Sequence, residues 1–303
     1  MSMRFGYWIN PTWTWADIRE SAMQAEGLGF DSLWMSDHFM PNAPTAVEGP
    51  TQECLSLLSA LSAVTSTVKL GSIVIGNTYR HPAVLANIAA TIDQISGGRF
   101  ILGLGAGWQE NEHEAYGIEF GTIRSRMDRL EETCEALNLL FSQARTTYDG
   151  VHVQFKDAPL DPKPVQSPLP ILIGGGGERR TLKIVAKHAH QWNVWGDAAT
   201  LEQKIGILNG HCADIGRDPS TIHKTAVALV FLNEDQESNE KLRATPLGRP
   251  AVIGTAVEVA EQMRAYEAVG VNEFLIPGFT WRNAAAAQQP LIALAAALKP
   301  VHG

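Results

Sequence analysis

The sequence predicts an α/β fold, a (β/α)8 TIM barrel in which eight parallel strands alternate with eight helices. Short apolar runs alternate with longer amphipathic stretches along the whole chain. Several of the apolar runs are continuous, as in parallel strands that are buried on both faces. Because no long linker separates the units, a closed barrel is favoured over an open doubly wound sheet. We expect residues 1–303 to form a single domain of this kind.

The expected elements follow one another in strict alternation. Strands are predicted at Arg4–Ile9, Ser32–Met35, Val68–Ile75, Phe100–Leu104, Ile171–Ile173, Gln191–Val194, Lys224–Leu232 and Glu273–Ile276. Helices are predicted between and after them, at Trp15–Leu28, Gln52–Ser66, Pro82–Ser96, Ser125–Phe141, Glu178–His188, Thr200–Ile215, Thr255–Val269 and Ala284–Leu298. Glycines that close the first and seventh of these helices, Gly29 and Gly270, support the order because glycine adopts the left-handed cap conformation at little cost.

Two segments exceed the minimal unit. The insertion after strand four, Ser142–Leu169, is rich in proline and contains Tyr148–Val151, which is typical of a hairpin turn. The insertion after strand seven, Asn233–Gly254, is polar. Long insertions on a barrel are usually lids or oligomer contacts, and a passive surface loop is the alternative.

Composition excludes several function classes. A net charge of -8 and a pI near 5.6, with no run of Lys or Arg, argue against a nucleic-acid partner. There is no signal-peptide pattern and no apolar run long enough for a bilayer, so we expect a cytoplasmic protein without a membrane partner. The three cysteines, Cys54, Cys134 and Cys212, lack redox or metal-ligand spacing, which fits a reducing compartment.

The loops after the strands are expected to form the active site, as in other barrels of this class. A run of four glycines, Gly174–Gly177, follows strand five and precedes the helix expected from Glu178. Backbone without side chains lets an anion approach the free N–H groups of a helix start, and Arg179 and Arg180 add cationic donors. The run predicts a phosphate site, with a flexible turn as the alternative. Neither a P-loop nor a GxGxxG fingerprint is present.

Candidate acid–base groups follow strands two and four. His38 can exchange a proton near neutral pH, and the adjacent Asp37 can raise its pKa. Glu110 is a second candidate, with helix N-terminal capping as its alternative role. His81 either contacts a cofactor or only starts a helix. Tryptophans at strand ends can form the wall of a flat cofactor site or belong to the core: Trp8, Trp108, Trp192 and Trp195.

No metal site is predicted, because His188 and His190 lack a third partner at ligand spacing.

Several of these segments together resemble the luciferase-like monooxygenase family, over nearly the whole chain. The resemblance rests on Ser36–Phe39, Asn77–Ala86, Ala90–Phe100 and Gly103–Trp108. The segment Ile171–Leu182 is similar to the actinobacterial subgroup that depends on the deazaflavin coenzyme F-420.

The resemblance implies a TIM barrel, usually dimeric, with an isoalloxazine or deazaflavin ring across its mouth. It implies a non-proline cis peptide in strand three, at Ile73-Val74, behind the ring. It places Asp37 and His38 near the redox edge. The expected catalytic residues are thus His38, Glu110 and Asp37, and the expected cofactor-binding residues are Asp37, His38, Ile73, Val74, Asn77, His81, Gly105, Ala106, Gly107, Gly174, Gly175, Gly176, Gly177, Glu178 and Arg179.

Two departures from the family pattern affect the expected substrate. The branch that oxidises sugar phosphates has a tryptophan shortly after the Asp-His pair, whereas Phe39, Met40 and Pro41 follow here, which argues against a sugar-phosphate substrate. His190 stands where relatives carry a carboxylate before strand six.

The sequence therefore predicts a homodimeric oxidoreductase that transfers a hydride between coenzyme F-420 and a small organic substrate. An FMN-dependent monooxygenase is the alternative, and a non-catalytic flavin-binding protein is a third interpretation.

Overall fold

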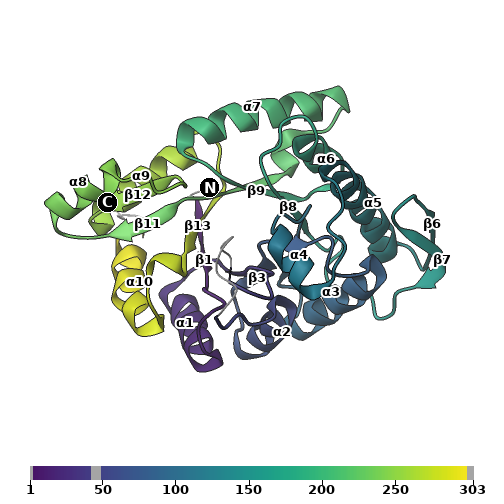
Figure 1. Ribbon diagram of the computed structural model, residues 1–303, viewed down its shortest axis with the longest axis horizontal. Helices are drawn as coiled ribbons and strands as arrows, with labels where there is room; N and C mark the ends of the chain where they lie inside the picture. Colours follow the sequence, from purple (N-terminus) through teal and green to yellow (C-terminus); the bar gives the residue numbers. More distant parts are fainter. Residues whose placement is uncertain (1–2, 42–48, 299–303) are drawn as a thin grey trace.

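The computed structural model describes residues 3–41 and 49–298, and they form the predicted (β/α)8 barrel (Figure 1). The strands run parallel in the order β3-β2-β1-β13-β10-β9-β8-β5, and pairing of β3 with β5 closes the barrel. Strand three is interrupted after β3 and resumes as β4, which pairs with β5. The bounds are β1 Arg4–Trp8, β2 Ser32–Met35, β3 Lys69–Ser72, β4 Ile75–Gly76, β5 Phe100–Gly105, β8 Ile171–Gly174, β9 Gln191–Trp195, β10 His223–Val227 and β13 Glu273–Pro277.

The barrel helices surround the strands and bury one face each against them. Their bounds are α1 Trp15–Leu28, α2 Cys54–Val64, α3 Pro82–Ser96, α5 Ile123–Ser142, α6 Thr181–His188, α7 Ala198–Asp214, α9 Ala256–Ala268 and α10 Ala284–Leu298. Single 3-10 turns lie at Pro219–Thr221 and Gly278–Thr280.

Local chemistry explains several helix ends. The Thr14 side chain caps α1 at its start, and Gly29, with φ +89°, ends it. Within the described ranges, no helix has the length and apolar character needed to cross a bilayer.

The structure corrects several sequence predictions of the helices and strands. The helix predicted from Glu178 begins at Thr181, because residues 178–180 form a turn after the glycines. A short helix, α4 (Glu110–Tyr116), was not predicted. The apolar run predicted as one strand, Lys224–Leu232, divides in two: after β10 the chain leaves the barrel, and β11 (Leu229–Leu232) pairs with β12 (Ala251–Gly254) in a separate sheet.

The two insertions lie on opposite sides of the barrel in Figure 1. The first contains the predicted hairpin, formed by β6 (Arg145–Asp149) and β7 (Gln154–Pro159). The carboxylate of Glu132 in α5 accepts hydrogen bonds from backbone N–H groups of residues 151–153 and fixes this hairpin to the barrel. The second insertion contains α8 (Gln236–Ala244) and β12.

An apolar cluster fills much of the barrel interior, and Ser32 and Glu273 lie at its N-terminal end. The apolar side chains are Trp8, Trp34, Ile73, Ile101, Leu172, Val227 and Leu275. The Trp34 ring lies where a side chain on Gly71 of the neighbouring strand would stand, so glycine is required there. Below it, Ser32 accepts a hydrogen bond from Trp34 Nε1 at 2.6 Å and donates to Glu273. Cys134 and Cys212 are completely buried and belong to the hydrophobic core.

Candidate active site

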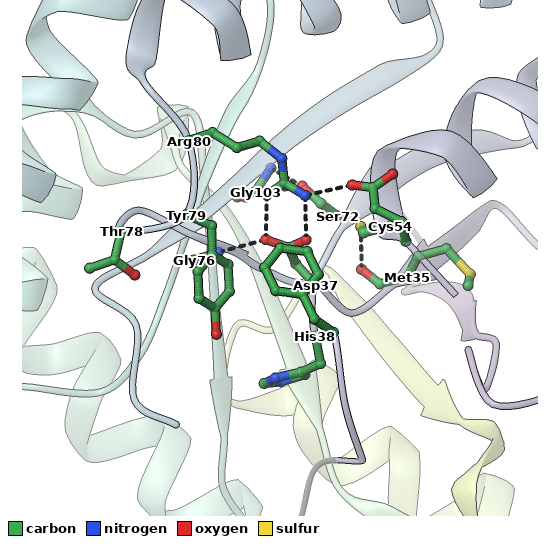
Figure 2. A network of polar contacts seen from close by, with 12 residues as sticks. Met35, Asp37, His38, Cys54, Ser72, Gly76, Thr78, Tyr79, Arg80 and Gly103 are labelled. Atoms are coloured by element: carbon green, nitrogen blue, oxygen red, sulfur yellow. Dashed lines mark hydrogen bonds and ion pairs between the residues drawn. The ribbon is translucent and has the colours of Figure 1, made fainter. Parts of the chain in front are cut away.

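A buried ion pair joins the loops after β2 and β4 at the C-terminal end of the barrel (Figure 2). The guanidinium of Arg80 binds both oxygens of Asp37, with N···O distances of 2.7 and 2.8 Å. Asp37 also accepts the Gly76 N–H at 3.1 Å, and Arg80 reaches Glu53 of α2 at 2.5 Å. Asp37 thus ties the loop after β2 to the start of the loop after β4.

The pair is charged and fully engaged. Burial raises the pKa of Asp37, while the hydrogen bonds and the charge of Arg80 oppose that rise. Burial lowers the pKa of Arg80, but its contacts with Asp37 and Glu53 outweigh this and raise it above its ordinary value. Both oxygens of Asp37 accept hydrogen bonds from Arg80. Asp37 therefore fixes the position of Arg80 rather than exchanging protons.

The second polar contact brings His38 against Glu112 of α4. His38 Nδ1 lies 3.0 Å from Glu112 Oε2, and Tyr79 donates its hydroxyl to the same oxygen at 2.5 Å. The other oxygen of Glu112 accepts the backbone N–H groups of Phe39 and Met40. Burial would raise the pKa of the Glu112 carboxyl, but these hydrogen bonds, that of His38 foremost, lower it instead. Glu112 is therefore an ionised, completely buried acceptor.

The predicted cis peptide at Ile73-Val74 is confirmed. It lies between β3 and β4, and the Val74 side chain extends across the strand ends of β5 and β8. A Cβ atom on Gly105 would lie 2.6 Å from Val74 Cγ2, and one on Gly174 would lie 2.8 Å from Val74 Cγ1. Glycine is therefore required at both positions, and we call Val74, Gly105 and Gly174 the floor of the barrel mouth.

Aromatic rings gather on the other side of the mouth. Trp8 at the end of β1 lies against Trp195 at the end of β9, with ring centroids 5.9 Å apart, and against Phe279 at 4.7 Å. Arg249, from the second insertion, places its guanidinium 4.9 Å from the Trp195 ring centroid. Trp108 meets the His38 ring edge-on at 5.7 Å and keeps 54% of its surface exposed.

Trp192 belongs to the core, with its surface fully buried and its indole nitrogen donating to the carbonyl of Gly175 at 2.8 Å.

Two buried donors near the strand ends have no protein partner in the described part of the chain: the indole nitrogen of Trp8 and the amide nitrogen of Asn77. Their residues are only 6% and 3% exposed. An unpaired buried donor costs free energy unless a ligand or water accepts from it. Both atoms are therefore candidates for a ligand contact.

The predicted phosphate loop is held by its neighbours. Lys204 of α7 donates to the Gly176 carbonyl at 2.8 Å and lies 3.3 Å from Glu178, while His211 contacts the Glu178 carbonyl at 2.8 Å. Arg179 is exposed, and Arg180 forms an ion pair with Asp128 of α5. The loop thus carries a fixed backbone beside a lysine and an exposed arginine.

The remaining predicted residues have local roles or stay at the surface. His81 caps α3, with Nδ1 accepting from the Ala83 N–H at 3.2 Å. Glu110 is exposed at the first position of α4, and no hydrogen bond joins it to His38 among the described residues. Ala106 and Gly107 follow β5 and are half-buried. His190 lies at the opposite end of the barrel, where its Nδ1 accepts the Ile171 N–H at 3.1 Å.

Sequence reasoning missed Glu112, Tyr79, Arg80 and Glu53 as parts of this network. Tyr79 and Arg80 belong to the segment Asn77–Ala86, which the sequence analysis did single out. They lie near Asp37 because the loop after β4 runs beside the loop after β2. The sequence does not indicate a role for Glu112, because α4 has seven residues and is too short for a helical hydrophobic periodicity to be recognised.

Comparison with known proteins places the chain among these barrels. The family model described as luciferase-like monooxygenase matches residues 3–247. An F-420-dependent glucose-6-phosphate dehydrogenase of Kineococcus radiotolerans is 39% identical over 161 residues, which are 53% of this chain and 47% of that protein. The chain thus spans about half the length of this curated relative.

Two solved structures share the fold over almost the whole chain. The coenzyme F-420 dependent tetrahydromethanopterin reductase from Methanopyrus kandleri has a TM-score of 0.83 at 18% identity, covering 99% of both chains. A long-chain alkane monooxygenase has a TM-score of 0.84 at 16% identity, covering 99% of this chain and 91% of that one. At such identities the likeness concerns the fold alone.

Proposed function

This chain belongs to the luciferase-like monooxygenase family, and on that premise we propose that it is an oxidoreductase transferring a hydride between coenzyme F-420 and a small organic substrate. The similarity to a dehydrogenase that is named for F-420 supports the choice of cofactor. The floor of the barrel mouth is the single structural observation that carries the proposal, because the Val74 side chain, packed against two glycines, forms an apolar surface at the strand ends where barrel enzymes bind ligands.

The residues present fit a deazaflavin. Val74 offers an apolar surface to one face of a flat ring, and Gly105 and Gly174 let the Val74 side chain lie close against the strand ends. The unpaired donors of Trp8 and Asn77 fit the oxygen and nitrogen acceptors of such a ring. Gly175–Gly177, with Glu178 and Arg179, would hold the phosphate tail beside the start of α6, and Ala106 and Gly107 would border it. Ile73 and His81 complete the proposed contacts.

Bound F-420 supplies a carbon centre that gives or takes a hydride. The protein's own residues supply position and the proton. His38 stands beside the mouth and exchanges the accompanying proton. Asp37, held by Arg80, keeps the loop that carries His38 in place. Trp8, Trp195 and Phe279 form an apolar wall that excludes water from the reacting atoms.

Titration of the purified protein with F-420 and, separately, with FMN tests the cofactor. Ligand fluorescence reports binding, and we expect F-420 to bind at least about tenfold more tightly than FMN. The variant Gly174→Val fills the floor and is expected to abolish binding, whereas Gly206→Val at an exposed position of α7 is the matched control. A preference for FMN would instead support the monooxygenase alternative. Binding of F-420 without turnover over a panel of carbonyl compounds and alcohols would support a binding protein.

A homodimer in the cytoplasm belongs to the same proposal. The buried, unpaired cysteines support a reducing compartment. Light scattering during gel filtration tests the dimer, for which a mass near twice 32.9 kDa is expected.

A further inference from the structure

The buried carboxylate of Glu112 contacts four hydrogen-bond donors. Oε1 accepts the N–H groups of Phe39 and Met40, whereas Oε2 faces both His38 Nδ1 and the hydroxyl of Tyr79. An ionised carboxylate has acceptors only. The proton in the contact with His38 must therefore sit on Nδ1.

The other ring nitrogen of His38 faces away from this network. Nε2 makes no hydrogen bond to any residue in 3–41 or 49–298, and 11% of the His38 side chain is exposed. The ring lies edge-on to Trp108, which is half exposed at the mouth. Nε2 is therefore the atom of His38 that a ligand arriving from solvent can reach.

We propose that Glu112 is a positioning residue that holds neutral His38 with its proton on Nδ1, so that Nε2 is the atom that exchanges the substrate proton. The inference rests on the proposed function. When a carbonyl is reduced, the hydride from the cofactor forms the new C–H bond with both electrons, and the Nε2–H bond of the imidazolium breaks to protonate the oxygen. Oxidation of an alcohol reverses both transfers. The negative charge of Glu112 favours the imidazolium that each cycle requires.

The other titratable or charged groups around His38 each have a partner. They are Asp37 and Glu53, both bound to Arg80; Tyr79, bound to Glu112; and His113, whose Nε2 faces the Thr78 hydroxyl at 2.6 Å and whose Nδ1 faces the Gln109 carbonyl at 2.7 Å. Glu112 is the carboxylate in direct contact with the ring, so a change in its charge acts on His38 first.

Nuclear magnetic resonance of the cofactor-free protein tests the inference. Two-bond 1H–15N correlations of 15N-histidine report the tautomer and the pKa of each imidazole, and the signal missing in His38→Gln assigns His38. The wild-type ring is expected to carry its proton on Nδ1 at alkaline pH. In Glu112→Gln the amide turns its NH2 toward Nδ1, so the proton of the neutral ring is expected on Nε2. Glu114→Gln, an exposed change on the same helix, is the matched control and leaves the tautomer unchanged.

Tyr79→Phe is a second variant, and it keeps the carboxylate of Glu112. Oε2 still faces Nδ1 after loss of the phenol donor, so the proton is expected to stay on Nδ1. A general loosening of the site would not reverse the tautomer in one variant and leave it in the other, and the wild-type tautomer alone tests the inference if Glu112→Gln does not fold.

A wild-type His38 protonated on Nε2, or the Nδ1–H tautomer retained in folded Glu112→Gln, would overturn the inference. The measurement needs no cofactor, so its failure is distinguishable from failure of the proposed function. If F-420 does not bind while His38 shows the Nδ1–H tautomer, the proposed function is wrong and the positioning by Glu112 stands.

Discussion

Nε2 of His223 lies 2.9 Å from Oε2 of Glu273 at the N-terminal end of the barrel, opposite to the end that holds His38 and Glu112. Glu273 is 3% exposed, and its other oxygen accepts the Ser32 hydroxyl. The two ends of the barrel thus each contain a contact between a histidine and a buried carboxylate, and one of them adjoins the aromatic mouth. The contact at the N-terminal end is expected to serve stability.

Replacing Glu273 with Ala is expected to lower the free energy of unfolding by about 3 kcal/mol, because it leaves the Ser32 hydroxyl and the His223 ring without an acceptor. Urea denaturation followed by circular dichroism measures this. Glu261→Ala, at an exposed position of α9, should change it by less than about 0.5 kcal/mol. Equal effects of the two variants would contradict a stabilising network.

Replacing Arg80 with Lys is expected to cost about 2 to 4 kcal/mol, since an ammonium cannot bind both oxygens of Asp37 in parallel and reach Glu53 as well. Arg145→Lys is the matched change in an exposed pair with Asp157, and no measurable cost is expected there because solvent screens the pair. Thermal unfolding of both variants compares them. A cost at Arg80 no larger than at Arg145 would show that the buried pair contributes little.

Gly103→Ala is expected to prevent folding or to cost about 3 kcal/mol, because the new methyl group would overlap the backbone carbonyl of Ser72 in the neighbouring strand. Gly206→Ala in α7, where no atom lies within 4 Å of the added carbon, is expected to raise the free energy of unfolding by about 0.5 to 1 kcal/mol. Soluble yield and urea denaturation separate the two outcomes. A stable Gly103→Ala protein would mean that the β3–β5 closure can widen.

The pH dependence of stability should include a contribution from Glu112. Its pKa is lowered in the folded protein from its usual 4.5, so its stabilising contribution is complete above 4.5 and is lost as the pH falls through the folded value. Glu112→Gln is expected to be less stable than the wild type at neutral pH, with the difference shrinking as the medium is acidified below 4.5. Urea denaturation at a series of pH values measures it. A difference that is constant with pH would contradict the lowered pKa.

Asn77→Leu is expected to separate stability from binding. It replaces a buried amide whose nitrogen is unpaired with an apolar side chain of similar size, so the free energy of unfolding without cofactor should stay equal or rise. The same change removes a proposed contact and should weaken F-420 binding about tenfold. Thermal unfolding measures the change in stability and fluorescence titration measures the change in affinity, both on one preparation. Unchanged affinity would remove Asn77 from the cofactor site.

Much of the fold follows from periodicity alone. The helices Trp15–Leu28, Pro82–Ser96 and Ala284–Leu298 have their predicted bounds, because caps or strand signals stand at their ends. The run Lys224–Leu232 was predicted as one strand since every part of it is apolar or β-branched, and composition does not reveal that a strand changes sheets.

The site was predictable only as far as strand ends could be identified. Asp37 and His38 lie directly after β2, where the sequence predicted them, but of the acidic residues after β5 the sequence singled out Glu110 as an acid–base candidate and not Glu112. The choice depends on the rotation of a single short helix, which sends Glu110 to solvent and Glu112 inward. The cis peptide at Ile73-Val74 was predicted by family resemblance, because no propensity of isoleucine or valine indicates it.

The depth of the barrel mouth depends on one side chain of its floor, that of Val74. Gly105 and Gly174 cannot accept a larger side chain, since each already touches Val74, but position 74 itself can become smaller. A smaller aliphatic residue at position 74 would therefore deepen the site in which the ligand lies. Substrate range can then evolve by changes in depth while the strands that build the barrel keep their sequence.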